Sequence, residues 1–262
     1  MPQRPVAVFA LDFDQGASTG SHSHPFGQLV HAADGLMRVL TGLGTWVVPP
    51  GRAVWIPPAL DHEVQMVTSV AMRTVYVVAK ALPGAPRAPC VVEVTPLLRE
   101  LILEALRRPR PYPLGGADER LFHLLLDSIS FREEVPLHLP VPTSAHLKAL
   151  ASRLRSDPAD KRSLAAWAKA TGTSSRTLAR AFRRETGLSF GAWRGQLRLM
   201  RALELLARGS RVTEVAFALG YESTSAFIQT FRRHLGTTPA RYFSSHVRAE
   251  PSVPKRSDTA GR

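Results

Sequence analysis

Two copies of one helix–turn–helix pattern follow each other between Ser163 and Phe243, and this duplication restricts the fold more than any other feature. Matching residues are 48 apart up to a turn glycine and 49 apart from a Phe-Arg-Arg triplet onward, so the extra residue falls in the turn or at the start of the second helix. The units cover about 164–186 and 212–235. The first contains Leu164, Trp167, Ala168, Gly172, Leu178, Phe182, Arg183, Arg184 and Gly187, and the second Val212, Val215, Ala216, Gly220, Phe227, Phe231, Arg232, Arg233 and Gly236. Such units place their second helix in the major groove of DNA, so the repeat predicts two recognition helices on one chain.

The charge distribution supports this prediction independently. The chain has a net charge of +13, and residues 143–262 alone have 22 basic and 8 acidic side chains, a net charge of +14. Residues 1–142 have a net charge of −1. Because neutralising phosphates drives most binding to nucleic acid, the excess in the half with the repeat predicts double-stranded DNA as the partner.

Four regions are predicted along the chain. Residues 1–82 have short β-branched and aromatic runs separated by Gly and Pro, which favour a β-sandwich or barrel. Residues 83–142 contain a Pro-rich link and accessory helices at Pro96–Arg107 and Ala117–Phe131. Residues 143–247 form the DNA-binding domain, and a polar tail follows at 248–262. The expected strands are Gln28–His31, Leu36–Leu40, Trp46–Val48, Ala53–Ile56 and Thr74–Val78.

The recognition helices have polar residues on their outward faces. Ser174 or Ser175 is expected to cap the first helix and Ser223 the second. The outward residues expected to read bases are Arg176, Ala179 and Arg180 in the first helix and Thr224, Ser225, Ile228 and Gln229 in the second. The arginines at the far ends of the helices are expected to contact phosphate or to make no contact: Arg183, Arg184, Arg232 and Arg233.

A long amphipathic helix is predicted at Phe190–Arg208, between the two units. Its apolar stripe consists of Trp193, Leu197, Met200, Leu203, Leu206 and Ala207. A rigid connecting helix would hold the two recognition helices in successive major grooves, which lie about 34 Å apart.

The C-terminal half resembles the AraC/XylS family of bacterial transcription activators. The strongest match is the segment Ala218–Tyr242, which is similar to the family signature, and Arg180–Gly187 also fits. The resemblance covers roughly Thr143–Val247 and implies the same base-facing positions as above, together with contact to RNA polymerase. Many members have Arg where this chain has Gln229.

The N-terminal region resembles a cupin, the small β-barrel that many members of that family use as a sensor. Gly16, His22, His24, Gln28 and Gly35 match the spacing of the first cupin motif. The second motif is matched loosely by Gly51, Pro57-Pro-Ala59 and His62. The implied architecture is α+β and multidomain, with a cupin-like β-barrel followed by an all-α domain of two helix–turn–helix units joined by a long helix.

A metal site is one interpretation of these histidines. His22 and His24 would lie on the same face of one strand, and His62 and Gln28 would complete a site for a divalent transition metal. Alternatively, the histidines line a site for an organic effector or remain from an ancestral metal site. Five isolated histidines have no such partners and are expected at the surface: His123, His138, His146, His234 and His246.

Two functions are compatible with the pattern: a regulator controlled by a small ligand or metal, which explains both halves, and a dioxygenase-like cupin metalloenzyme with a nucleic-acid-binding module. The accessory helices would form a homodimer interface or close the open end of the barrel. Cys90 is the only cysteine, and no apolar run reaches the roughly 20 residues of a membrane span. We therefore expect a soluble, cytoplasmic protein with no membrane partner and no catalytic residues.

Overall fold

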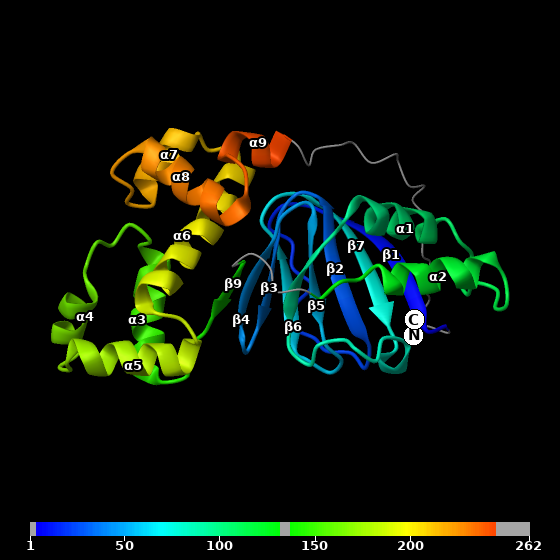
Figure 1. Ribbon diagram of the computed structural model, residues 1–262, viewed down its shortest axis with the longest axis horizontal. Helices are drawn as coiled ribbons and strands as arrows, with labels where there is room; N and C mark the ends of the chain where they lie inside the picture. The colour runs from blue at the N-terminus through cyan, green and yellow to red at the C-terminus, as the bar shows by residue number, and fades with distance from the viewer. Residues whose placement is uncertain (1–3, 132–136, 245–262) are drawn as a thin grey trace.

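The computed structural model describes residues 4–131 and 137–244. Figure 1 shows a β-sheet domain with two helices on one side and an all-helical domain at the other end. This α+β arrangement is the architecture expected from the sequence. The predicted tail at 248–262 and His246 lie outside the described residues.

Two antiparallel sheets face each other in the N-terminal domain. One sheet has the strand order β1-β7-β2-β5-β8, and the other has the order β6-β3-β4-β9. The strands are β1 (Val6–Phe13), β2 (Gly27–Asp34), β3 (Met37–Thr41), β4 (Gly44–Val48), β5 (Arg52–Ile56), β6 (His62–Met66), β7 (Val70–Val77), β8 (Cys90–Glu93) and β9 (His138–Pro140). All five expected strands are confirmed, as β2, β3, β4, β5 and β7. In addition, β8 and β9 come from the region where a link and helices were expected.

Side chains alternate between the two faces of the five-stranded sheet, as the strand period of two requires. On β5, Val54 and Ile56 face the other sheet, whereas Ala53 and Trp55 face outward. The outer face is covered by α1 (Pro96–Leu106) and α2 (Ala117–Asp127). Both predicted accessory helices exist, but they cover a sheet face rather than the open end of a barrel.

The helical domain repeats one local structure twice. It consists of α3 (Ala145–Ser156), α4 (Leu164–Ala170), α5 (Ser175–Thr186), α6 (Phe190–Ala207), α7 (Val212–Ala218), α8 (Thr224–Leu235) and α9 (Pro239–Ser244). Ser174 and Ser223 cap α5 and α8. Each serine hydroxyl accepts a hydrogen bond from the backbone N–H of the residue three positions later. Both helices end at a glycine with φ of +74°, a left-handed conformation that favours Gly.

The turn contains the extra residue of the second unit. One residue separates Gly172 from the cap Ser174, whereas two separate Gly220 from Ser223. The duplicated pattern, the caps and the connecting helix α6 are therefore confirmed.

The strand β9 ties the segment between the domains to the β-domain. It pairs with β4, and Trp193 of α6 donates its indole N–H to the Pro140 carbonyl over 2.9 Å. His138 stacks on Trp46 with ring centroids 4.2 Å apart, so its prediction as an isolated surface residue was wrong. Burial lowers the pKa of His138 to about 4.

Protonation of His138 should destabilise the fold in acid. Its folded pKa of about 4 lies below the ordinary value of 6.5, so the unfolded chain binds more protons between these pH values. Stability is therefore complete above about pH 6.5 and falls toward pH 4, by up to about 3 kcal/mol for this residue. Urea titrations at pH 7 and pH 4.5 should show that the free energy of unfolding falls less between these pH values in the His138→Phe variant than in the wild type. The control variant His146→Phe, at an exposed position, should show the same decrease in stability as the wild type. If His138→Phe also shows this decrease in full, protonation of His138 is not its cause.

Candidate effector site and DNA-binding surface

Three imidazoles and one amide converge between the two sheets. His22 and His24 come from the connection between β1 and β2, Gln28 from β2, and His62 from the start of β6. One ring nitrogen from each histidine lies within 4.8 Å of the others. The expectation that His22 and His24 occupy one strand was wrong, because His22 forms only an isolated bridge with His62.

The three imidazoles are oriented by the backbone. The Nδ1 atoms of His22, His24 and His62 lie 3.0, 2.9 and 2.8 Å from carbonyl oxygens two residues away in sequence. A carbonyl only accepts, so each Nδ1 carries the proton and each Nε2 keeps a free lone pair. Metal-binding histidines are usually fixed in this way by a partner on the second ring nitrogen.

Gln28 brings its amide oxygen to the same point. Its Nε2 donates to Thr74 Oγ1 at 2.9 Å and to Tyr76 Oη at 3.1 Å. The Oε1 atom is thereby turned toward the Nε2 atoms of His24 and His62, at 3.1 Å from each. With the Nδ1 atoms protonated, these facing atoms are all acceptors, and a cation or an added proton between them would relieve their repulsion.

Burial favours the neutral state that a metal ligand needs. Gln28 and His62 are almost fully buried, and burial lowers the pKa of His62, with His22 and His24 adding to the effect. His22 and His24 are partly exposed, which leaves the site open on one side. Three imidazole nitrogens and an amide oxygen fit a divalent transition metal ion.

Thr74 and Tyr76 are neighbours of the candidate site that the sequence analysis missed. They lie 46 and 48 residues from Gln28, and both are on β7, which pairs with β2. No motif spacing marks them. The strand register could have found them, since Gln28 and Tyr76 are directly opposite.

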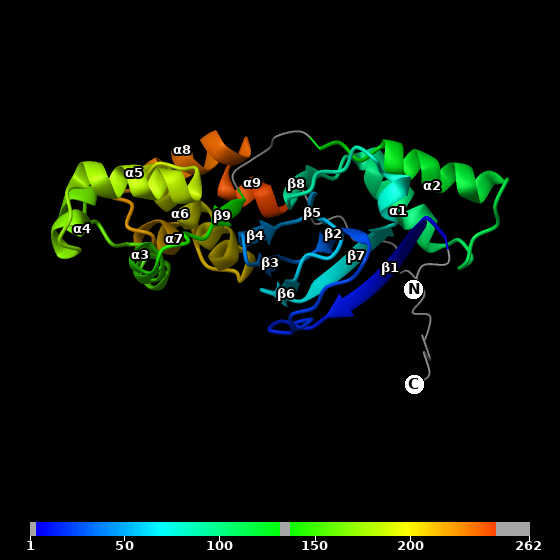
Figure 2. The same cartoon turned by 90° about the horizontal axis from the view of Figure 1, so that it is seen from below.

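The recognition helices α5 and α8 lie along the same side of the helical domain in Figure 2 and on either side of α6 in Figure 1. The exposed candidates for base reading are Arg176, Arg180, Ser225 and Gln229, and the half-buried candidates are Ala179, Thr224 and Ile228. Both phosphate candidates, Arg183 and Arg232, are exposed. Within the described residues, Arg176, Arg180, Arg183 and Arg232 have no acidic partner, so their charges are available to an external anion, whereas Arg184 lies 3.8 Å from Glu185.

The loop between α3 and α4 braces the two units against each other. Arg198 of α6 donates from Nε to the Pro158 carbonyl over 2.8 Å. A Cβ on Gly220, in the second turn, would lie 2.8 Å from the Ala159 carbonyl oxygen. The loop therefore contacts both the connecting helix and the second turn.

Glu185 ties the first recognition helix to α3, a contact that the sequence analysis did not identify. Its carboxylate accepts bonds from the backbone N–H groups of Thr143 and Ser144, at 2.9 and 2.8 Å, and from both hydroxyls. Burial alone would raise the pKa of Glu185, but these hydrogen bonds outweigh it and the pKa is lowered. The carboxylate supplies the N-terminal cap that α3 otherwise lacks.

The two domains contact each other through α6. Arg38 of β3 lies 3.5 Å from the buried carboxylate of Glu204, which also pairs with Arg201 at 2.7 Å. Arg208 donates to the Val67 carbonyl over 3.4 Å. The connecting helix is therefore attached both to the sensor sheet and to the two recognition helices.

A β-domain with a histidine cluster, joined to two helix–turn–helix units, is the organisation of a ligand-responsive DNA-binding protein. Residues 6–166 match the AraC-like ligand binding domain, and residues 167–245 match a helix–turn–helix domain. The chain belongs to the AraC family of transcription regulators.

One similar protein matches most of the chain, and others match a part of it. The chain is 35% identical over 234 residues to the HTH-type transcriptional regulator NimR of Escherichia coli, covering 89% of this chain and 85% of NimR. It is 38% identical over 117 residues to RipA of Corynebacterium glutamicum, covering 45% of this chain and 35% of RipA. The solved DNA-binding domain of AdpA in complex with a target DNA matches 39% of this chain and 94% of that chain, with 30% identity and a TM-score of 0.37.

The regulator hypothesis is therefore confirmed, and the alternative of a cupin metalloenzyme receives no support from these relatives, which are transcription regulators. In the described part of the chain, no helix combines the length and the apolarity of a membrane span.

Proposed function

We propose that α5 and α8 read bases in two adjacent major grooves of one DNA duplex. The observation that carries this proposal is the duplicated cap, length and exposed face of the two helices. Proposed base contacts come from Arg176, Ala179, Arg180, Thr224, Ser225, Ile228 and Gln229. Arg183 and Arg232, nearer the helix ends, contact phosphates and fix the orientation.

Replacement of Arg180 tests the base-reading assignment. Arg180 lies one turn into α5, is exposed and has no acidic partner in the described residues. We expect Arg180→Ala to weaken specific binding by about 1–3 kcal/mol and to relax selectivity at one base pair. Competition titrations on operator and random DNA measure both quantities, with Lys80→Ala as the control, because Lys80 is exposed between β7 and β8, outside the recognition helices and the helices α1 and α2. Equal losses on the two DNAs would identify a phosphate contact instead.

The sensor proposal concerns His22, His24, Gln28 and His62. They hold a divalent transition metal ion, which would supply Lewis acidity and open coordination positions to a small-molecule effector. Support comes from the converging acceptor atoms and from the carbonyl groups that fix each imidazole. Thr74 and Tyr76 hold the Gln28 amide in the required orientation.

The effector signal would pass from the sensor site to α6. His62 begins β6, and β6 pairs with β3, which carries Arg38. The Arg38–Glu204 pair then joins β3 to α6. A change in the position of β6 would shift this contact and alter the separation of α5 and α8, which lie on either side of α6.

Assembly and location complete the proposal. The sensor comprises 1–82 together with the accessory region 83–142, because β8 and β9 complete its two sheets. The DNA-binding domain is 143–247, and the segment 248–262 follows it. Two chains form a homodimer through α1 and α2, and the DNA-bound protein contacts RNA polymerase in the bacterial cytoplasm, as the AraC family assignment suggests.

A further inference from the structure

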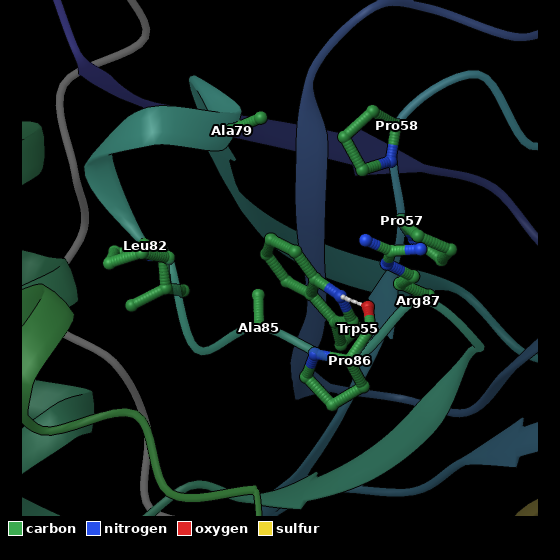
Figure 3. Close-up of a pocket in the computed structure, with 9 residues that line it drawn as sticks. Trp55, Pro57, Pro58, Ala79, Leu82, Ala85, Pro86 and Arg87 are labelled. Carbon is green, nitrogen blue, oxygen red and sulfur yellow. Dashed lines mark hydrogen bonds between the residues drawn. The ribbon is translucent and has the colours of Figure 1, made fainter.

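A cavity lies on the outer face of the five-stranded sheet, apart from the histidine site. Its volume is about 280 Å³, just below the range of about 300–1,000 Å³ that suits drug-sized ligands. Figure 3 shows it around the indole of Trp55, at the end of β5. It is lined by Trp55, Pro57, Pro58, Ala79, Leu82, Pro83, Ala85, Pro86 and Arg87. We call this cavity the Trp55 pocket.

The walls of the Trp55 pocket are apolar and rigid. The Trp55 indole N–H is already engaged, because it donates to the Pro86 carbonyl over 3.0 Å. The other end of the ring lies against the backbone of Gly27, where any Cβ would overlap it. Prolines and small side chains form most of the remaining wall, and they lose little conformational entropy when a ligand binds. These walls suit a small, flat, apolar group.

Arg87 adds a single positive charge to this apolar wall. Arg87 lines the pocket, and in the view of Figure 3 its guanidinium lies between Trp55 and Pro57. The Arg87 residue is exposed, and its guanidinium has no acidic partner among residues 4–131 and 137–244. A guanidinium binds a carboxylate with two parallel hydrogen bonds. The Trp55 pocket therefore combines a surface for a planar apolar group with a partner for a carboxylate.

The segment that forms one wall of the Trp55 pocket is hydrogen-bonded to two residues of the histidine site. Pro57 and Pro58 continue into Ala59, whose N–H donates to the His24 carbonyl over 2.8 Å. The next residue, Leu60, accepts the Nδ1–H of His62 over 2.8 Å. Displacement of this segment by a ligand would move two of the three imidazoles together.

We propose that the Trp55 pocket binds a small planar carboxylic acid and that occupancy reorients His24 and His62. The binding step depends only on the pocket itself. Its regulatory consequence depends on the proposed sensor function of the histidine site.

Titration of the full-length protein with benzoate and indole-3-carboxylate tests the binding step. Calorimetry should show binding of at least one acid, with benzamide binding at least 10-fold more weakly than benzoate if benzoate is the ligand. The exposed substitution Arg87→Gln should weaken acid binding at least 10-fold, and Ala85→Leu should abolish it by filling the cavity. The control Arg120→Gln removes an equally exposed arginine on α2 and should bind as the wild type does. No binding of either acid, or unchanged affinity in Arg87→Gln and Ala85→Leu, would overturn the proposal.

Imidazole ¹⁵N resonances of the metal-free protein test the link to the histidine site. Saturating acid should shift the resonances of His24 and His62 while leaving that of the exposed His146 unchanged. If the acid binds without these shifts, the reorientation is wrong. Because neither measurement uses DNA, failure of operator binding in a separate titration would refute the proposed function without affecting this result.

Discussion

The variant His62→Ala should lose a bound transition metal ion. Each of four ligands contributes roughly a quarter of the about 10–16 kcal/mol with which proteins hold a structural zinc ion, so removal of one should weaken affinity more than about 100-fold. Wild-type protein purified without chelator should contain about one ion per chain, and His62→Ala much less than one. Elemental analysis, followed by competition with a chromogenic chelator, measures both values.

A matched pair of variants separates ligand loss from unfolding. His146→Ala removes an exposed imidazole on α3 and should keep the metal. Gln28→Glu should bind the metal more tightly, because a carboxylate adds a negative charge and the hydroxyls of Thr74 and Tyr76 can donate to it. Wild-type protein that stays free of metal after reconstitution with Zn²⁺, Fe²⁺, Ni²⁺ and Cu²⁺ would refute the metal site and leave an organic effector.

Disruption of the α1–α2 surface should have the largest effect on DNA binding. Leu97 and Leu124 are 56% and 48% exposed on neighbouring helices whose other apolar residues cover the sheet. We expect the double variant Leu97→Glu/Leu124→Glu to be monomeric and to lose the roughly 10²–10⁴-fold advantage of binding two linked operator sites. Its affinity for a single site should not change, because each chain keeps both recognition helices.

Sedimentation and titrations on one-site and two-site DNA measure these quantities in parallel. Leu43→Glu is the control, since Leu43 is 52% exposed in the turn between β3 and β4, away from α1 and α2. A monomeric wild type without preference for paired sites would exclude the homodimer while leaving the DNA-binding assignment intact.

Both helix–turn–helix units and the connecting helix could be predicted from the sequence, whereas α3 and α9 were not. The signals for these helices are serine caps, terminal glycines and apolar residues four positions apart. Each acts within one or two helical turns, so it can be recognised from residues that are close in sequence. Because the pattern occurs twice, the assignment of each helix could be compared with that of its counterpart. Both caps and α6 lie where the pattern predicted them. The exposed Arg180 and Gln229 followed from the same periodicity.

The sensor half was predictable only in part. Motif spacing brought His22, His24 and His62 together, although it placed the first two on a strand that does not form. The strand β9 and the stacking of His138 on Trp46 were missed, because a three-residue strand has almost no pattern of its own. The segment is a strand because it pairs with β4, which lies about 90 residues earlier in the sequence.

By itself, the sequence determined the class of protein, the two recognition helices and the histidines that meet in the sensor domain. Only the tertiary structure decided which way the Gln28 amide points, since Thr74 and Tyr76 reach it through the pairing of β2 with β7. It alone placed Arg38 beside Glu204 and formed the Trp55 pocket from β5 and the segment 79–87. These contacts join residues far apart in sequence, and their geometry depends on strand register and packing rather than on local periodicity.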